Sequence, residues 1–215
     1  MSDIVVRGEK VRSNPIPERN YNQFKYRLEE VSGQYAERNL AIFYIGVATG
    51  YRLQDIVGLT IGEIKESLED DKFIIQEQKQ YNAWEEWRRQ NPNKNRKPPK
   101  KREAVIKVNL RKFLNSYCRN KPKSAYAFES HKKGNHITQQ SYSAILTKVG
   151  KDLGLKDISG HSLRKTYATR LYNYTRDLEF VRKALNHKSV ETTKLYLGIE
   201  DEIKDNSSMI ADDKL

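Results

Sequence analysis

The amino-acid sequence predicts a mostly helical α+β domain with one small antiparallel hairpin of strands. Most of the chain falls into segments of helical length with apolar residues at helical spacing, and the segment 36–49 is nearly continuously apolar from Leu40 onward. Only 71–79 and 103–108 have the character of strands. With 215 residues, the chain has the length of one domain with a substantial core.

The composition favours a polyanionic partner and excludes several other classes of protein. Lys and Arg together number 40 against 28 Asp and Glu, and the isoelectric point is near 9.6. The single cysteine, Cys118, excludes a disulfide framework and fits a reducing compartment. No apolar run approaches the ~20 residues of a membrane span, and the N-terminus lacks a signal-peptide pattern. We therefore expect a cytoplasmic protein.

The chain divides into a short N-terminal arm, one domain and a tail. Residues 1–17 are polar and basic and contain Pro15 and Pro17, which indicates a linker or arm. The domain covers 18–198, and an acidic tail with a few apolar residues covers 199–215. Before the C-terminal region, helices are predicted over 18–31, 36–49, 110–120 and 138–150, the last of them capped by Thr138.

The two predicted strands are joined by an unusually long connection, 80–102. Residues 88–102 of this connection include eight basic residues and no acidic one, are interrupted by prolines, and follow Trp84 and Trp87. A segment of this composition cannot form a core, so it is either a mobile loop or an arm that lies on a phosphate backbone. The candidate nucleic-acid contacts are Arg88, Arg89, Lys94, Arg96, Lys97, Lys100, Lys101 and Arg102.

Arg52 occupies an unusual place for a charged residue. It follows the end of the buried helix 36–49 and precedes apolar residues at helical spacing, so its charge is expected to be partly buried and to need a partner. Asp55, three residues on, is the candidate partner. Two interpretations stand at this point: a structural Arg–Asp pair, or a clamp for a phosphate.

The stretch from Gly160 to Gly198 concentrates the residues with catalytic potential, which are His161, Arg164, His187 and Tyr196. With Ser162 as the N-cap of a helix, His161 lies at the helix entrance and Arg164 in the first turn, where backbone N–H groups favour an anion. This arrangement describes a phosphate site to which Tyr196, on a later short helix, is brought as the nucleophile. The sequence contains no P-loop, dinucleotide fingerprint or metal-ligand cluster, so we expect neither a cofactor nor a metal.

Three motifs in order resemble those of the tyrosine recombinases, the lambda-integrase family. The sequence ATGYRLQDIVGLT resembles the first box, HSLRKTYAT resembles the second box, and LNHKSVETTKLYLG resembles the end of that box with its tyrosine. The order and spacing of Arg, His-x-x-Arg, His and Tyr match from Arg52 to Tyr196. The resemblance covers 18–198 and implies the catalytic-domain fold of that family.

The resemblance also implies a role for each residue of the set. Arg52 and Arg164 would hold the scissile phosphate, because the planar guanidinium donates two hydrogen bonds and stays charged at any working pH. Tyr196 would attack phosphorus, expel the 5′-hydroxyl and leave a 3′-phosphotyrosyl bond. His161 resembles the histidine that assists proton transfer, and His187 the one that donates to a non-bridging oxygen.

Two further residues resemble functional positions of the family. Lys79 resembles the lysine that acts as general acid for the leaving 5′-oxygen, and Asp55 matches the acidic position that supports the first-box arginine. The insertion 80–102 leaves Lys101 and Lys72 as alternatives to Lys79. Asn186 stands where the family commonly has glycine, and because asparagine also tolerates the left-handed conformation, little effect is expected.

The resemblance therefore predicts that the protein is a site-specific recombinase or integrase that acts on double-stranded DNA. Two alternatives remain: a topoisomerase-like nicking–closing enzyme, which shares the chemistry, and a DNA-binding regulator or accessory factor, which keeps the fold but no longer cuts. Only 17 residues precede the first helix, so the chain is either a naturally short member or the catalytic domain of a longer integrase. The tail 199–215 is either disordered or docks on the basic body in cis or in trans, and docking in trans would support a homo-tetramer on DNA.

Overall fold

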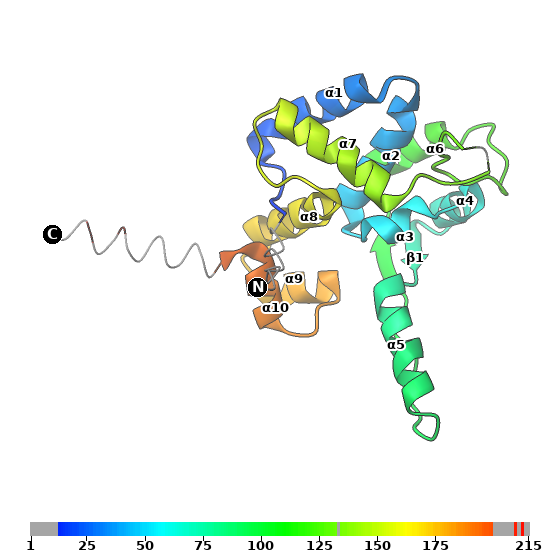
Figure 1. Cartoon of the computed structure of the whole chain (residues 1–215), viewed down its shortest axis with the longest axis vertical. Coiled ribbons are helices and arrows are strands. Elements are labelled where there is room, and N and C mark those ends of the chain that lie inside the picture. The colour runs from blue at the N-terminus through cyan, green and yellow to red at the C-terminus, as the bar shows by residue number, and fades with distance from the viewer. Residues whose placement is uncertain (1–12, 133, 200–208, 210–211, 213–215) are drawn as a thin grey trace, which may run out of the picture.

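A computed structural model of the chain describes residues 13–132, 134–199, 209 and 212. Its elements follow one another around a helical body from which one helix projects (Figure 1). In chain order they are the short 3₁₀ helices η1 (Glu18–Asn20) and η2 (Gly33–Tyr35) on either side of α1 (Tyr21–Ser32), then α2 (Ala36–Thr49), α3 (Leu53–Val57), α4 (Ile61–Glu69), β1 (Lys72–Ile75), α5 (Gln78–Gln90), β2 (Arg102–Val105), α6 (Val108–Tyr117), α7 (Gln139–Asp152), α8 (Gly160–Thr175), α9 (Leu178–Leu185) and α10 (Val190–Leu197). The predicted mostly helical α+β class is confirmed.

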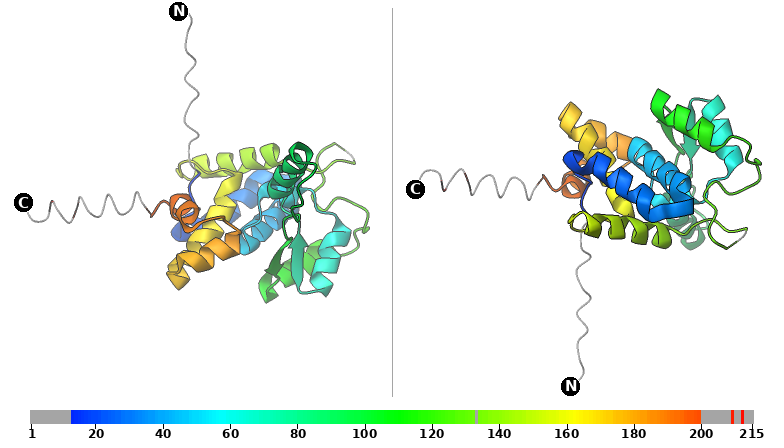
Figure 2. Two further views of the ribbon diagram at one scale, coloured as in Figure 1. Left: turned by 90° about the horizontal axis from the view of Figure 1, so that it is seen from below. Right: turned by 90° about the horizontal axis from the view of Figure 1, so that it is seen from above.

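Helix α2 is the centre of the core. It packs against α1, α6 and α8, while α7 covers α1 and part of α8. Its run from Leu40 to Ile45 is buried apart from Tyr44, in agreement with the predicted buried central helix. Figure 2 shows α1, α2, α7 and α8 in one part of the body, with α4, α6 and the sheet gathered at the other end. The end of α2 therefore lies where these two parts meet.

The sheet has only two strands, which pair antiparallel with Phe73 opposite Ala104 and Ile75 opposite Arg102. Phe73 is fully buried and meets the ring of Tyr51 edge-on at 6.4 Å between centroids. Both strands are shorter than predicted. The first prediction, 71–79, is wrong beyond Ile75, because the chain leaves the sheet there and enters a helix at Gln78.

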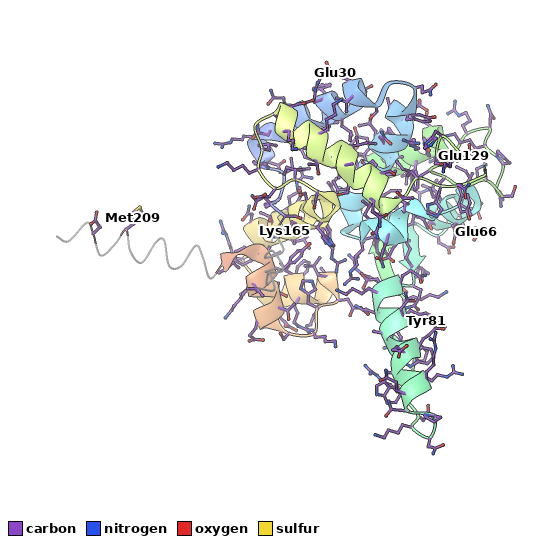
Figure 3. All side chains as sticks on the ribbon, viewed as in Figure 1. Glu30, Glu66, Tyr81, Glu129, Lys165 and Met209 are labelled. Carbon is purple, nitrogen blue, oxygen red and sulfur yellow. The ribbon has the colours of Figure 1, made fainter. Side chains whose placement is uncertain are left out.

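The long connection between the strands is a helix followed by a return segment, and we call residues 78–101 the arm. The prediction of a loop is wrong for 80–90, which together with residues 78 and 79 form α5, a helix with no buried residue that projects from the body (Figures 1 and 3). Trp84 Nε1 donates to the carbonyl of Arg96 at 2.8 Å, and the Arg96 guanidinium lies 5.4 Å from the Trp87 ring centroid. The two tryptophans thus fasten the return segment to the helix.

The C-terminal helices α8, α9 and α10 begin at side-chain caps. The caps are Ser159, Asp177 and Ser189, so the prediction of Ser162 as the cap of α8 is wrong by three residues. Ser162 instead closes the capping box by accepting from the backbone N–H of Ser159. As predicted, Thr138 caps α7, and Asn186 adopts the left-handed conformation at the end of α9. In the described part of the chain, no helix has the length and apolarity to cross a membrane.

Gly50 ends α2 in the left-handed conformation, with φ of 63°. A Cβ at this position would fall 2.3 Å from Cδ1 of Tyr167, so both the backbone and the packing require glycine. We predict that Gly50→Ala lowers the free energy of unfolding by at least about 1–3 kcal/mol, as measured by urea denaturation. Gly58→Ala is the matched control, because Gly58 has φ of −84° and no atom within 4 Å of the added Cβ. Equal stability of the two variants would contradict the prediction.

Candidate active site

The two arginines singled out in the sequence meet at one carboxylate. Arg52 is the N-cap residue of α3, directly after the end of α2, and Arg164 lies in the second turn of α8. Oε1 of Glu77 accepts from Arg52 Nη1 at 2.6 Å and from Arg164 Nη1 at 3.2 Å. Both guanidinium groups are therefore gathered at a single point, as a phosphate clamp requires.

Arg164 is almost completely buried and is satisfied by helix ends. Its Nη1 donates to the carbonyl of Gly50 at 2.6 Å, and its Nη2 donates to the carbonyl of Leu185 at 2.6 Å. These carbonyls lie at the C-terminal ends of α2 and α9, where the helix dipoles favour a cation. Burial, followed by the neighbouring charge of Arg52, lowers the pKa of Arg164 to about 10 while Glu77 opposes the shift, so the group remains charged at neutral pH.

A third arginine, Arg102, joins the same two helix ends. It donates through Nε to the carbonyl of Ala184 at 2.9 Å and through Nη2 to the carbonyl of Thr49, one residue before those used by Arg164 at each end. Its guanidinium also lies 4.5 Å from the ring centroid of Tyr51. Arg102 was predicted to belong to the DNA-contacting set, and that prediction is wrong because the side chain is buried and committed to these partners.

Asp55 is not the ion-pair partner of Arg52. Its Oδ1 accepts from the backbone N–H of Gln78 at 3.0 Å, and its Oδ2 is buried without a hydrogen-bond partner among the described residues. Burial raises the pKa of Asp55, the hydrogen bond from Gln78 opposes the shift, and Glu77 adds to it. The sequence therefore placed the acid correctly beside the arginine but assigned the ion pair to the wrong carboxylate.

His187 and Tyr196 lie together beside the arginines. Their ring centroids are 5.2 Å apart, and His187 Nδ1 is 3.1 Å from Oγ1 of Thr193. Burial, followed by the charges of Arg164, Arg52 and then a third arginine, lowers the pKa of His187 to about 4. At neutral pH the imidazole is therefore neutral and retains one N–H to donate.

The hydroxyl of Tyr196 is buried and makes no hydrogen bond with any residue that the structure describes. Its burial raises the pKa to about 12, although the charges of Arg164 and Arg52 act in the opposite direction. Lys165 Nζ lies 5.6 Å from the ring centroid (Lys165 is labelled in Figure 3). The phenol is thus protonated at neutral pH and needs a base before it can act as a nucleophile.

The two remaining candidate residues, His161 and Lys79, are both exposed. His161 is exposed in the first turn of α8. Lys79, exposed in the first turn of α5, lines a cleft of about 580 Å³ together with Arg52 and His187. Of the alternatives to Lys79, Lys72 pairs with Glu103 at 3.1 Å, and Lys101 lines clefts that contain neither Arg52 nor His187.

The same cleft continues onto the arm, where it is lined by Trp84, Trp87, Arg96 and Lys97. The other predicted nucleic-acid contacts, Arg88, Arg89, Lys94, Lys100 and Lys101, are exposed. A chain of positive charge therefore extends from the arginine pair along the arm. Such a surface suits a ligand with regularly repeated phosphates.

Sequence reasoning missed Glu77 and Thr193. Glu77 is nearly completely buried although it lies within a run of polar residues in the sequence, so neither periodicity nor composition distinguishes it. Thr193 is buried on α10 beside His187, and its position one turn before Tyr196 is the only signal that the sequence offers. Within the described ranges, no group of three His, Cys, Asp or Glu residues is placed to hold a metal ion.

Comparisons with known proteins give relatives by sequence and by structure. The model of the phage integrase family matches residues 16–202. The probable integrase/recombinase YoeC of Bacillus subtilis is 25% identical over 166 residues, which are 77% of this chain and 80% of YoeC. Tyrosine recombinase XerC of Herpetosiphon aurantiacus is 27% identical over 175 residues, which are 80% of this chain and 51% of XerC.

Among solved structures, the XerH site-specific recombinase bound to its difH substrate before cleavage has a TM-score of 0.60 to this chain at 22% identity. The alignment covers 86% of this chain and 50% of XerH. The chain therefore spans most of YoeC but about half of these two recombinases. The structural likeness confirms the predicted fold.

The lowered pKa of His187 predicts a pH dependence of stability. Between about pH 6.5, the ordinary value, and about pH 4, the unfolded chain binds a proton at this histidine that the folded chain does not. The contribution of His187 to the free energy of unfolding is therefore complete above pH 6.5 and is lost as the pH falls toward 4. Urea denaturation of wild type and of His187→Gln across this pH range measures this contribution. The difference in free energy of unfolding between the two proteins should shrink as the pH is lowered. A difference that stays constant with pH would contradict the shift.

Proposed function

The chain belongs to the phage integrase family, which confirms the resemblance of its three motifs, and we propose that it is a site-specific tyrosine recombinase acting on double-stranded DNA. The observation that carries the proposal is the position of Tyr196 beside His187 and the pair Arg52 and Arg164. A phenol, an imidazole and two guanidinium groups at one place are what phosphoryl transfer to a tyrosine needs.

The reaction begins with attack of the Tyr196 oxygen on the scissile phosphorus. The phenol gives up its proton, the new O–P bond forms, and the bond from phosphorus to the 5′-oxygen breaks, which leaves a 3′-phosphotyrosyl bond and a 5′-hydroxyl. Arg52, Arg164 and the N–H of His187 stabilise the negative charge that gathers on the non-bridging oxygens. Loss of one such preorganised donor typically raises the barrier by about 3–4 kcal/mol.

We assign the two proton transfers of the reaction to two exposed residues. His161 would accept the phenol proton, and Lys79 would donate a proton to the leaving 5′-oxygen. The exposure of both side chains and the position of Lys79 in the cleft beside Arg52 and His187 support these roles. The covalent intermediate conserves the energy of the phosphodiester, so a second 5′-hydroxyl can attack it and reseal the strands without ATP. Strand exchange follows when that hydroxyl comes from the partner duplex.

The proposal extends to the partners of the arm and of the tail. We propose that the exposed basic residues of the arm contact the DNA backbone next to the cleavage point. We also propose that the protein assembles as a tetramer on DNA through the tail 199–215, all but a few residues of which lie outside the described part of the chain. Action on chromosomal or mobile DNA would place it in the cytoplasm of a bacterial host.

The nucleophile is tested by replacing Tyr196 with Phe. Wild type mixed with nicked duplexes from the DNA that flanks its gene should give a protein–DNA band that survives SDS, and Tyr196→Phe should give none while binding the duplex with nearly unchanged affinity. A band retained in the variant would move the nucleophile elsewhere. Relaxation of supercoiled DNA without site preference would identify a nicking–closing enzyme, and tight binding without any adduct would favour the regulator.

The arm is tested by the salt dependence of DNA binding. Replacing Arg88, Arg89, Lys94 and Lys97 by Gln should reduce the slope of log affinity against log salt by up to about 0.9 for each lost phosphate contact. A control variant removes the same charge from α6 and α7 and the turn after α6, away from the arm in Figure 1, through Lys112, Arg119, Lys148 and Lys151. If both variants lower the slope equally, the arm has no special contact with DNA.

A further inference from the structure

The carboxylate of Glu77 occupies the position in which a phosphate would bind. One of its oxygens accepts hydrogen bonds from Arg52 and Arg164 together, at 2.6 and 3.2 Å. The side chains of Glu77 and Arg164 are only 2% and 3% exposed. An anionic oxygen shared by two guanidinium groups is also the arrangement that a non-bridging phosphate oxygen would adopt.

A phosphate cannot reach this pair while Glu77 remains there. Both terminal nitrogens of Arg164 already donate, to Glu77 and the carbonyl of Gly50 through Nη1 and to the carbonyl of Leu185 through Nη2. Arg52 keeps 17% of its side chain exposed and lines the cleft, so it is the first of the two that a ligand meets. A phosphate beside an unmoved Glu77 would also face a like charge in a buried place.

We propose that Glu77 is an internal ligand of the arginine pair, which holds the phosphate position in the DNA-free protein and leaves it when the scissile phosphate binds. The inference rests on the proposed function, because it assigns Arg52 and Arg164 to the phosphate. Glu77 also neutralises two buried, neighbouring cations in the free state. This explains why a carboxylate of the protein itself is found at a site whose proposed ligand is the scissile phosphate.

The arm is the element that can move Glu77. Glu77 is the N-cap residue of α5, and the next residue, Gln78, is bonded through its N–H to Asp55. One turn into the helix, Gln80 exchanges two hydrogen bonds with Asn186, the residue before His187. A shift of α5 toward DNA would break these contacts and withdraw Glu77. Contact of DNA with the arm and opening of the arginine pair are therefore coupled.

This coupling has a thermodynamic consequence. If a phosphate binds only the state from which Glu77 has withdrawn, its apparent affinity is reduced by the fraction of protein in that state. By linkage, any change that removes Glu77 from the pair strengthens phosphate binding by the same factor. The effect does not depend on cleavage, so it can be measured with inorganic phosphate.

The test compares wild type with Glu77→Gln, which keeps the shape of the side chain and removes its charge. Thermal unfolding is followed with increasing inorganic phosphate against sodium chloride of equal ionic strength. In chloride the variant should unfold at a lower temperature than wild type, because two buried cations lose their counter-charge. Phosphate should raise the midpoint of thermal unfolding of the variant back toward that of wild type. The apparent affinity of the variant for phosphate should be about tenfold or more above that of wild type.

The control is Glu66→Gln, which removes the same charge from the exposed face of α4 (Glu66 is labelled in Figure 3). It should respond to phosphate as wild type does. If Glu77→Gln binds phosphate no more tightly than these two proteins, Glu77 is only a structural partner of the arginines and the proposal is overturned.

Wild type itself provides a second measurement, which holds even if the variant does not fold. In an NMR titration with phosphate, the side-chain N–H signals of Arg52 and Arg164 and the carboxyl signal of Glu77 should shift together. Movement of the arginine signals with an unchanged Glu77 signal would overturn the proposal. Failure of the proposed function would instead show as the absence of a covalent Tyr196 adduct, whatever the response to phosphate.

Discussion

The burial of the Arg164 guanidinium is the constraint on which the site depends. A guanidinium cannot be deprotonated at neutral pH, so its removal from water is tolerated only when its donors find acceptors and its charge finds a counter-charge. The carbonyls of Gly50 and Leu185 supply the acceptors, and Glu77 supplies the charge. The ends of α2 and α9 and Glu77, two residues after β1, must therefore meet at one point.

The small sheet matters to the site more than its size indicates. Its two strands carry few core residues, but the chain leaves β1 toward Glu77 and enters β2 at Arg102. Glu77 contacts the arginine pair, and Arg102 joins the same helix ends as Arg164. The arm lies between these two residues, so its base is fastened to the active site on both sides. A ligand that bends the arm would act directly on the charges that we propose to bind phosphate.

The concentrated positive charge also sets the protonation of the neighbouring groups. Together with burial it keeps His187 neutral, so that this residue acts as a hydrogen-bond donor and not as a cation. For Tyr196 the same charges act against burial, which nevertheless prevails and keeps the phenol protonated. A buried, protonated nucleophile and an arginine pair occupied by a carboxylate both describe a site at rest. Under the proposed function, cleavage would require DNA to assemble the reactive arrangement, and this requirement would protect the protein from reaction with stray phosphodiesters.

The sequence by itself determined the helical class, the cap of α7 by Thr138 and, through three motifs, the family and its candidate residues from Arg52 to Tyr196. These features are local, because a cap or a motif is written in neighbouring residues. Only the tertiary structure decided that Glu77 joins the arginines, that Arg102 is buried, and that residues 78–90 after β1 form a helix. Glu77 and Arg164 are 87 positions apart, and no periodicity connects them. Their pairing follows from the need to neutralise a buried charge, which exists only once the helices have packed around it.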